Sequence, residues 1–248
     1  MERPMKRMSM IAAASVGLLA ASPAQAIVGA AVPDESFAPH LAMLLKAARG
    51  SAFCTAVVIA RNVLLTAAHC VDKPENLRIY WPGGDLNREV RAVVTHPLYR
   101  ADAPKTREVS IDLALVRTAE PLPARFQPVP IDWEARVEPG TGFRIAGYGL
   151  TNEDDPKTAG KLHAARLVVR EPISRILIWA IDPARKGLGA CVGDSGGPFF
   201  SQDGRMLAGI IVWSAGANRK NCGDLTQGVR LGPQRDFIEK TLRDWGIR

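Results

Sequence analysis

The chain has 248 residues, 47% of them hydrophobic, and a formal net charge of +7 at pH 7. This length is enough for one or two domains with hydrophobic cores of their own. The lysines and arginines form no long run and are not interleaved with aromatic residues, so the composition argues against a nucleic-acid-binding protein, while a basic patch for an acidic partner or surface stays open.

Residues 1–26 have the pattern of an export signal. Three basic residues, Arg3, Lys6 and Arg7, precede an apolar, alanine-rich run over 8–21, and Ala24-Gln25-Ala26 supplies the small residues of a signal peptidase site. A retained membrane anchor is disfavoured because the run is shorter than the roughly 20 residues that a spanning helix needs. Cleavage after Ala26 removes three basic residues and one acidic residue, which lowers the charge from +7 to +5. It leaves a soluble, secreted or periplasmic chain that begins at Ile27.

Short apolar runs separated by turn residues predict a chain made mostly of strands. A proline-rich stretch over 118–142 divides them into two groups, because proline removes a ladder donor and restricts φ. Pro233 begins a helix in which apolar residues recur at helical spacing, as expected for a packing face. The expected strands cover residues 41–45, 54–59, 77–81, 90–95, 111–116, 143–148 and 162–169, followed by a hairpin of 198–201 with 205–213.

The stretch Gly193-Asp194-Ser195-Gly196-Gly197-Pro198 sets a serine between glycines. A serine nucleophile needs an adjacent base and donors for the oxyanion that it creates, and flanking glycines let backbone N–H groups turn toward one point. On this string alone, a glycine-rich surface turn is the simpler interpretation. The stretch also fits the G-x-S-x-G elbow of α/β-hydrolases, in which the histidine follows the serine. That fold is excluded because all four histidines precede Ser195: His40, His69, His96 and His163.

Candidate partners for this serine are one histidine and one aspartate. His69 lies among small residues in Thr66-Ala67-Ala68-His69-Cys70; His96 and His163 compete with it as the base, and a lone histidine there could be a core residue. Asp112 interrupts an expected apolar strand, where an unpaired carboxylate costs several kcal/mol. It could instead face water from an edge strand, or it could hold a histidine in the tautomer that catalysis needs.

Four cysteines and one further carboxylate suggest covalent and ionic links. An even cysteine count in an exported chain predicts two disulfides, with three pairings open. A zinc site is less favoured, because the sequence has no C-x-x-C pair. A buried Asp194 beside a nucleophile would need a partner, and the α-ammonium of a new N-terminus at Ile27 suits it. The cysteines are Cys54, Cys70, Cys191 and Cys222.

These segments, in the order His…Asp…Ser, resemble the signature segments of the chymotrypsin/trypsin-like serine proteases, and Ile27-Val28-Gly29 resembles the mature N-terminus of that family. The resemblance implies an all-β fold of two antiparallel six-stranded β-barrels with a C-terminal α-helix and the active site between the barrels. The expected boundaries are 1–26 for the signal and 27–248 for the protease domain, with a first barrel about 27–120, a connector about 121–140, a second barrel about 141–232 and a helix about 233–246.

The resemblance also implies a role for each residue of the site. His69 would take the proton of Ser195, Asp112 would orient the imidazole, and the N–H groups of Gly193 and Ser195 would form the oxyanion hole. Ile27 would pair with Asp194. The family's disulfides would be Cys54–Cys70 and Cys191–Cys222.

The expected substrate pocket departs from the trypsin pattern. Trypsins carry an aspartate six residues before the nucleophile, and this chain has Gly189, followed by Ala190. Ser214 replaces a usual glycine on the wall, which narrows the opening. We therefore expect cleavage after small to medium apolar residues. The remaining wall residues would be Val212, Trp213 and Gly228.

No cofactor is expected. No metal is expected either, because the region between His69 and His96 is short compared with that of family members that bind calcium there, and it has few clustered carboxylates. The expected partners are a protein or peptide substrate and, as a further option, a protein inhibitor; neither nucleic acid nor, after signal removal, membrane is expected, and the chain is expected to be a monomer. Because Ala26 precedes Ile27, export itself would release the activating N-terminus. The alternatives are a non-catalytic binding module and an esterase with the same triad.

Overall fold

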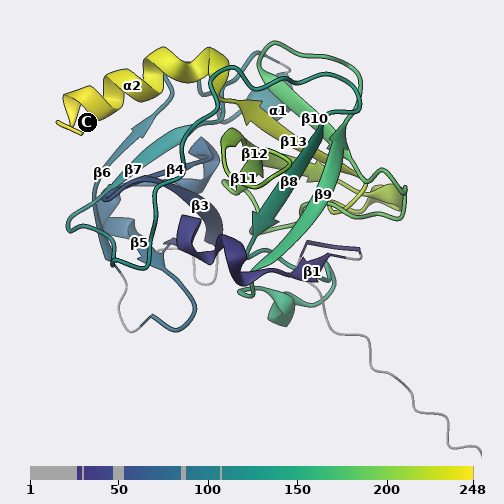
Figure 1. Ribbon diagram of the computed structural model, residues 1–248, viewed down its shortest axis with the longest axis horizontal. Helices are drawn as coiled ribbons and strands as arrows, with labels where there is room; N and C mark the ends of the chain where they lie inside the picture. The colour runs from purple at the N-terminus through teal and green to yellow at the C-terminus, as the bar shows by residue number, and fades with distance from the viewer. Residues whose placement is uncertain (1–26, 30, 47–52, 85–87, 107, 248) are drawn as a thin grey trace, which may run out of the picture.

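The computed structural model describes residues 27–29, 31–46, 53–84, 88–106 and 108–247. The expected export signal, residues 1–26, lies outside this part of the chain. The described residues form two six-stranded antiparallel barrels and a C-terminal helix, which confirms the predicted fold class (Figure 1). None of the helices among them is long and apolar enough to cross a membrane.

The first barrel closes through the strand order β2-β3-β4-β7-β6-β5. Its interior is filled by fully buried aliphatic side chains such as Leu44, Val58, Leu64 and Ile79. Successive residues of a strand point to opposite faces, so each strand also sends side chains outward. The strands are β2 (Leu41–Lys46), β3 (Phe53–Ala60), β4 (Val63–Thr66), β5 (Leu77–Tyr80), β6 (Arg88–Thr95) and β7 (Ala114–Thr118).

The second barrel follows the order β9-β10-β13-β12-β11-β8 and closes by pairing β8 with β9. The short strand β1 (Val32–Pro33) pairs with β9 at its outer edge, so the start of the chain is attached to the second barrel. The core holds Phe143, Ile145, Ile178 and Phe199. The strands are β8 (Gly142–Gly147), β9 (His163–Val169), β10 (Leu177–Ile181), β11 (Pro198–Phe200), β12 (Leu207–Ala215) and β13 (Leu225–Arg230).

A third apolar cluster joins the two barrels. Val57 and Leu65 of the first barrel belong to the same buried cluster as Phe200 and Ile210 of the second. Because protein cores are close-packed, this cluster fixes how the barrels sit against each other. We refer to these four residues as the seam.

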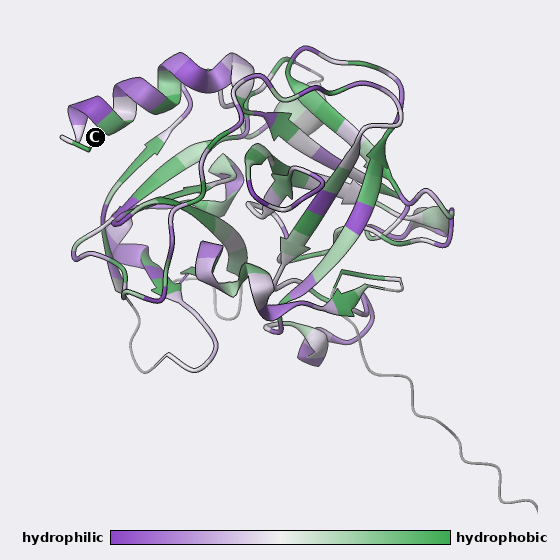
Figure 2. Cartoon of the chain, viewed as in Figure 1, coloured by the Kyte–Doolittle hydropathy of each residue, from purple (hydrophilic) through white to green (hydrophobic). Residues whose placement is uncertain are grey.

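Helix α2 (Arg235–Asp244) extends the shared cluster with Ile238, which is fully buried. The ring of Phe237 meets the ring of His96 edge-on, 4.6 Å between centroids. Figure 2 shows hydrophobic residues along the strands and hydrophilic residues over much of α2. The short helices are η1 (Glu35–His40), η3 (Ala68–Cys70), η4 (Pro74–Asn76), α1 (Ala103–Thr106), η5 (Pro156–Thr158), η6 (Ala217–Arg219) and η7 (Gly232–Gln234).

The structure corrects the expected strand over 111–116. β7 begins only at Ala114, because the N–H of Leu113 donates to the carbonyl of Ile111 over 2.9 Å and bends the chain at Asp112. Asp112 therefore lies in a turn before the strand. The pattern also gave no strand at β4, β10 or β13; β13 mixes polar residues with a glycine, which hides any alternation.

Candidate active site

His69 and Asp112 are brought together by two neighbouring strands of the first barrel. His69 lies in η3, just after β4, and Asp112 lies just before β7; the two strands pair at Thr66 and Ala114. Nδ1 of His69 is 2.6 Å from Oδ2 of Asp112, and the backbone N–H of His69 donates to Oδ1 over 2.9 Å. One carboxylate thus holds both the ring and the backbone of the histidine.

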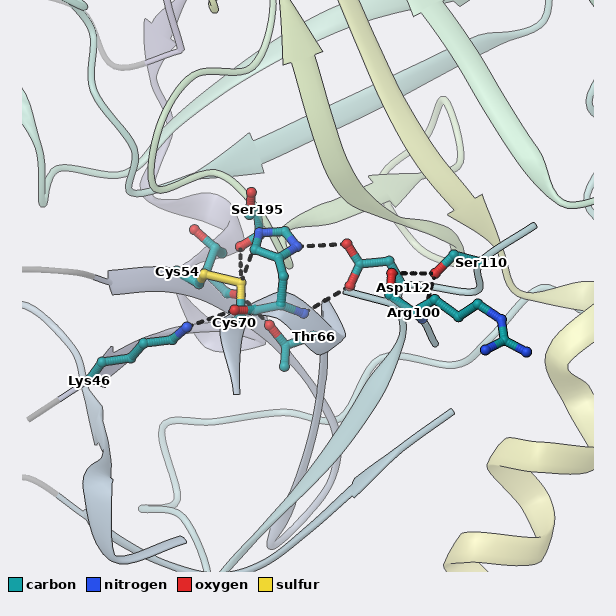
Figure 3. A network of polar contacts seen from close by, with 10 residues as sticks. Lys46, Cys54, Thr66, Cys70, Arg100, Ser110, Asp112 and Ser195 are labelled. Atoms are coloured by element: carbon teal, nitrogen blue, oxygen red, sulfur yellow. Dashed lines mark hydrogen bonds and ion pairs between the residues drawn. A yellow bond between two sulfur atoms is a disulfide. The ribbon is translucent and has the colours of Figure 1, made fainter. Parts of the chain in front are cut away.

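This pairing determines how the imidazole can act. A carboxylate only accepts hydrogen bonds, so the proton of the neutral ring lies on Nδ1 and Nε2 is left as an acceptor. The side chain of Asp112 is 20% exposed, which makes it half-buried rather than enclosed. Lys46 Nζ donates to the carbonyl of His69 over 2.6 Å, and the Cys54–Cys70 disulfide ties η3 to β3 (Figure 3).

Ser195 lies in a tight loop that is bonded to both barrels. Its carbonyl accepts from the N–H of Thr55 over 2.9 Å, and the N–H of Gly196 donates to the carbonyl of Ile211 over 2.7 Å. Gly196 has φ +83°, and a Cβ there would lie 2.1 Å from the carbonyl oxygen of Thr55. Only glycine fits this position, so the glycine after the serine is required by close packing.

Ser195, His69 and Gly193 line one open cavity of about 390 Å³ between the barrels. Within the described residues, no hydrogen bond joins the Ser195 hydroxyl to the His69 ring. Such bonds are often long before a substrate is bound. The structure therefore brings the serine and the histidine to one cavity, with Asp112 bonded to the histidine.

The backbone around Gly193 leaves two N–H groups, those of Gly193 and Ser195, without an acceptor among the described residues. Gly193 has φ +96°, and the N–H of Asp194 donates to the carbonyl of Cys191 over 3.1 Å, which closes a turn. The carbonyl of Val192 accepts from the N–H of Leu150, so the N–H of Gly193 points the opposite way across a trans peptide. Neither this N–H nor that of Ser195 donates to another described residue.

Asp194 is a fully buried carboxylate behind the serine. Oδ1 accepts from the N–H of Gly149 over 2.8 Å, and Oδ2 accepts from the N–H of Cys191 over 2.9 Å. Burial raises the pKa of Asp194 to about 7, although these hydrogen bonds pull it down. Ile27 is also fully buried, and Val28 pairs with Gly189. In the uncleaved chain the nitrogen of Ile27 is a peptide N–H, so its ion pair with Asp194 stays a prediction.

The second disulfide links the serine loop to the opposite wall of the cavity. Cys191 is bonded to Cys222, with 4.5 Å between their Cα atoms. Together with Cys54–Cys70, this confirms both predicted pairings. The cysteine sulfurs near His69 belong to a disulfide and are not free thiolates, the form in which cysteine binds metal.

The structure separates the expected pocket residues into two groups. Val212, Trp213 and Ser214 line the cavity beside Ser195. The others are buried and do not line it: Gly189, Ala190 and Gly228.

The base of the expected pocket is closed by backbone. A Cβ on Gly189 would lie 1.8 Å from the carbonyl oxygen of Gly223, so no side chain fits at residue 189. The N–H of Ala190 donates to Oγ1 of Thr226, which is fully buried, over 2.9 Å. Residue 189 therefore contributes no side chain, and no charge, to the expected pocket.

Two residues that the sequence did not indicate support the wall of the cavity. Ser214 Oγ donates to the carbonyl of Asn221 over 2.6 Å. The N–H and the Nδ2 of Asn221 donate to Glu153 over 3.0 Å and 2.7 Å. Glu153 lies in a loop more than 60 residues away in sequence, so no local pattern could have indicated the contact.

A second, larger cavity of about 820 Å³ extends from His69 and Asp112 over an apolar surface. Tyr99 lines it next to Asp112; burial and the Asp112 carboxylate both raise the pKa of Tyr99. Two of its apolar side chains are well exposed, Val109 at 67% and Trp213 at 49%. The other apolar lining residues include Ile176, Leu177, Trp179 and Leu225.

The competing histidines lie elsewhere. His96 is buried against Phe237, and burial lowers its pKa. His163 is buried in β9, and Nδ1 of His40 is 2.7 Å from the carbonyl of Gln127. None of these three lines either cavity.

Comparison with known proteins identifies one family of similar sequences and structures. The sequence profile of the Trypsin family matches residues 26–232. Trypsin epsilon of Drosophila erecta is 28% identical over 79% of this chain and 80% of its own length. Glucanase inhibitor protein 2 of Phytophthora sojae is 25% identical over 89% of this chain and 81% of its own length. A solved structure of neuropsin, a serine protease of mouse brain, superposes with a TM-score of 0.67 at 23% identity, covering 82% of this chain and 94% of that one.

Proposed function

The chain belongs to the trypsin family of serine proteases, and from this premise we propose that it is an active serine endopeptidase with His69, Asp112 and Ser195 as its triad. One observation carries the proposal: His69 is held at two points by Asp112 and lines the same cavity as Ser195. A serine hydroxyl becomes a useful nucleophile only beside such an oriented base.

The reaction then follows from the atoms at the site. Nε2 of His69 takes the proton of Ser195 Oγ as the oxygen attacks the substrate carbonyl, and Asp112 stabilises the imidazolium that forms. The N–H groups of Gly193 and Ser195 donate to the oxyanion. The imidazolium gives its proton to the leaving amine, and a water activated by His69 hydrolyses the acyl-enzyme.

The closed base of the pocket favours a small to medium apolar residue before the scissile bond. The carbonyl of Gly223 occupies the space where a side chain of residue 189 would lie, so no carboxylate is available there to pair with lysine or arginine. Ser214, tied to Asn221, narrows the entrance.

Export is proposed to activate the enzyme. Removal of residues 1–26 would leave the α-ammonium of Ile27, which is already buried in the second-barrel core. Asp194 is buried with a raised pKa, so a nearby cation would favour its charged form. N-terminal sequencing of active, exported protein tests this, and a first residue other than Ile27 would refute it.

Two other functions compete with the proposal. One relative is named as a glucanase inhibitor, which illustrates a binding role for a chain of this fold; the presence of all three triad residues here argues for catalysis. An esterase would use the same residues, and comparing the rates on extended peptides and on simple esters separates the two.

The deciding experiment is cleavage of a peptide library varied at the residue before the scissile bond, with Ser195→Ala protein as the control. Cleavage after small or apolar residues that is lost in Ser195→Ala supports the triad and the expected pocket together. Strong cleavage after lysine or arginine would overturn the specificity. No cleavage by protein that begins at Ile27 would overturn the proposed activity.

A further inference from the structure

Thr55 of β3 is fully buried and holds the loop that carries the serine. Its Oγ1 donates to the carbonyl of Gly193 over 2.9 Å and accepts from the N–H of Tyr148 over 3.2 Å. Its own N–H donates to the carbonyl of Ser195 over 2.9 Å. One residue of the first barrel is therefore bonded to both residues proposed to supply the oxyanion donors.

Gly193 has no side chain to restrict its backbone, so its conformation depends on hydrogen bonds to the peptides on either side of it. Its φ of +96° is one of many that glycine adopts freely. The peptide before it is held where the carbonyl of Val192 accepts from the N–H of Leu150. The peptide after it is held at both ends: its N–H, that of Asp194, donates to the carbonyl of Cys191, and its carbonyl, that of Gly193, accepts from the Thr55 hydroxyl. A buried carbonyl that lost this partner would be expected to turn toward another donor.

The Thr55 backbone is itself fixed. Oγ1 of Thr66, on the adjacent strand β4, donates to the carbonyl of Thr55 over 2.9 Å. β4 leads directly into η3, which carries His69. The path from the histidine to Gly193 thus runs through two buried threonines of the first barrel.

We propose that Thr55 is a positioning residue that sets the oxyanion-binding geometry of the second barrel from the first, by holding the Gly193 carbonyl so that the Gly193 N–H faces the cavity. The inference rests on the proposed function, since it concerns the same site. Thr55 does not touch the substrate, and it acts through Gly193.

Three variants test the role of the hydroxyl. Thr55→Val removes it with little change of shape, and Thr55→Ser keeps it. Thr118→Val is the matched control. Thr118, the last residue of β7, is also fully buried, and its Oγ1 also donates to a backbone carbonyl, that of Glu120.

The expected kinetic result is specific to the transition state. Thr55→Val should lower kcat by about 10- to 100-fold with KM nearly unchanged, somewhat less than the ~10² to 10³ for loss of an oxyanion donor. Affinity for a peptidyl trifluoromethyl ketone, which forms a tetrahedral oxyanion adduct with the serine, should fall by a similar factor. Thr55→Ser should recover most of both quantities, and Thr118→Val should lower thermal stability without changing either.

A structural readout separates this inference from the proposed function. Spectra of ¹⁵N-glycine-labelled protein should show the Gly193 amide shifted or broadened in Thr55→Val and not in Thr118→Val. An unmoved Gly193 amide, or kinetic losses equal in the two variants, would overturn the positioning role. If the wild-type chain neither cleaves peptides nor forms the adduct, the proposed activity fails; a moved Gly193 amide in Thr55→Val would still support the positioning role, and an unmoved one would overturn it.

Discussion

The two halves of the candidate site are built in different ways. The first-barrel half, His69 and Asp112, lies at the ends of paired strands and is joined by two hydrogen bonds and anchored by a disulfide. The second-barrel half is made of loops around Ser195 and the buried Asp194. These loops turn at glycines with positive φ: Gly187, Gly193, Gly196 and Gly223.

This difference indicates what each half depends on. The hydrogen bonds and the disulfide that hold His69 and Asp112 come from the first barrel. The serine loop packs around Asp194, a buried titratable group that accepts two backbone hydrogen bonds and has no cationic partner among the described residues. We therefore expect changes in the first half to affect chemistry alone, and changes in the second half to respond to pH and to N-terminal cleavage as well.

The largest expected loss of kcat comes from removing either the serine of the second half or the histidine of the first half. Ser195→Ala and His69→Ala should each lower kcat on the order of 10⁶-fold, and the double variant should be no worse than either, because the two groups act as one unit. Steady-state rates on a peptide substrate check this. An undiminished Ser195→Ala variant would mean that the nucleophile is wrongly assigned, and multiplicative losses would mean that the two residues act separately.

Asp112→Asn should affect the first half alone. The amide can donate to Nδ1, which moves the ring proton to Nε2 and removes the acceptor that the serine needs, at a cost of roughly 10⁴ in kcat. Because the shape is nearly unchanged, the melting temperature should stay close to that of the parent. Kinetics and calorimetry on the same sample test both statements, and a kcat near the parent value would contradict the tautomer argument.

The pH dependence should distinguish the second half. Burial raises the pKa of Asp194 from 3.8 to about 7 in the uncleaved chain, so the folded state binds the proton more tightly than the unfolded state. The free energy of unfolding is then highest below about pH 4 and falls as pH rises through 7, by up to about 4 kcal/mol. Urea unfolding of refolded full-length chain carrying Ser195→Ala, at pH 5 and pH 8, should show about 3 kcal/mol of this fall, because part of it lies below pH 5.

Two comparisons make that measurement specific. Adding Asp194→Asn should flatten the dependence, and protein that begins at Ile27 should lose it, since the ammonium would keep Asp194 charged. Equal stability of the uncleaved chain at both pH values would contradict the buried-carboxylate argument.

The smallest effect should come from the wall of the cavity. Glu153→Gln keeps the size of the side chain but weakens the hydrogen bonds to Asn221, which in turn holds Ser214. This exposed contact is worth little to stability. We expect a few-fold shift in relative cleavage after larger and smaller residues, with kcat on the best substrate unchanged. A changed melting temperature with unchanged selectivity would mean that Glu153 supports the fold and not the pocket.

The resemblance of a few sequence segments to a known family was sufficient for the fold class and for the grouping of His69 with Asp112, whereas the residues alone left His96 and His163 open as the base. The sequence was insufficient for the turn at Asp112, which an i to i+2 hydrogen bond imposes within an apolar run. The role of Thr55 was also out of reach, because its hydroxyl meets a carbonyl 138 residues away. Likewise, the sequence shows that Gly189 stands where trypsins carry an aspartate. Only the structure shows that the carbonyl of Gly223 occupies the space that a side chain at residue 189 would need.

The seam connects turnover to side chains that line neither cavity. The proposed nucleophile, Ser195, and the proposed base, His69, come from different barrels, so their spacing depends on how Val57 and Leu65 pack against Phe200 and Ile210. A misplacement of about 1 Å at reacting atoms can cost ~10² in rate. Substitutions at these four positions are therefore under two kinds of selection: they must keep water out of the core, and they must keep Ser195 and His69 correctly placed. A variant in which both barrels fold can still lose activity through a small change in how the barrels pack together.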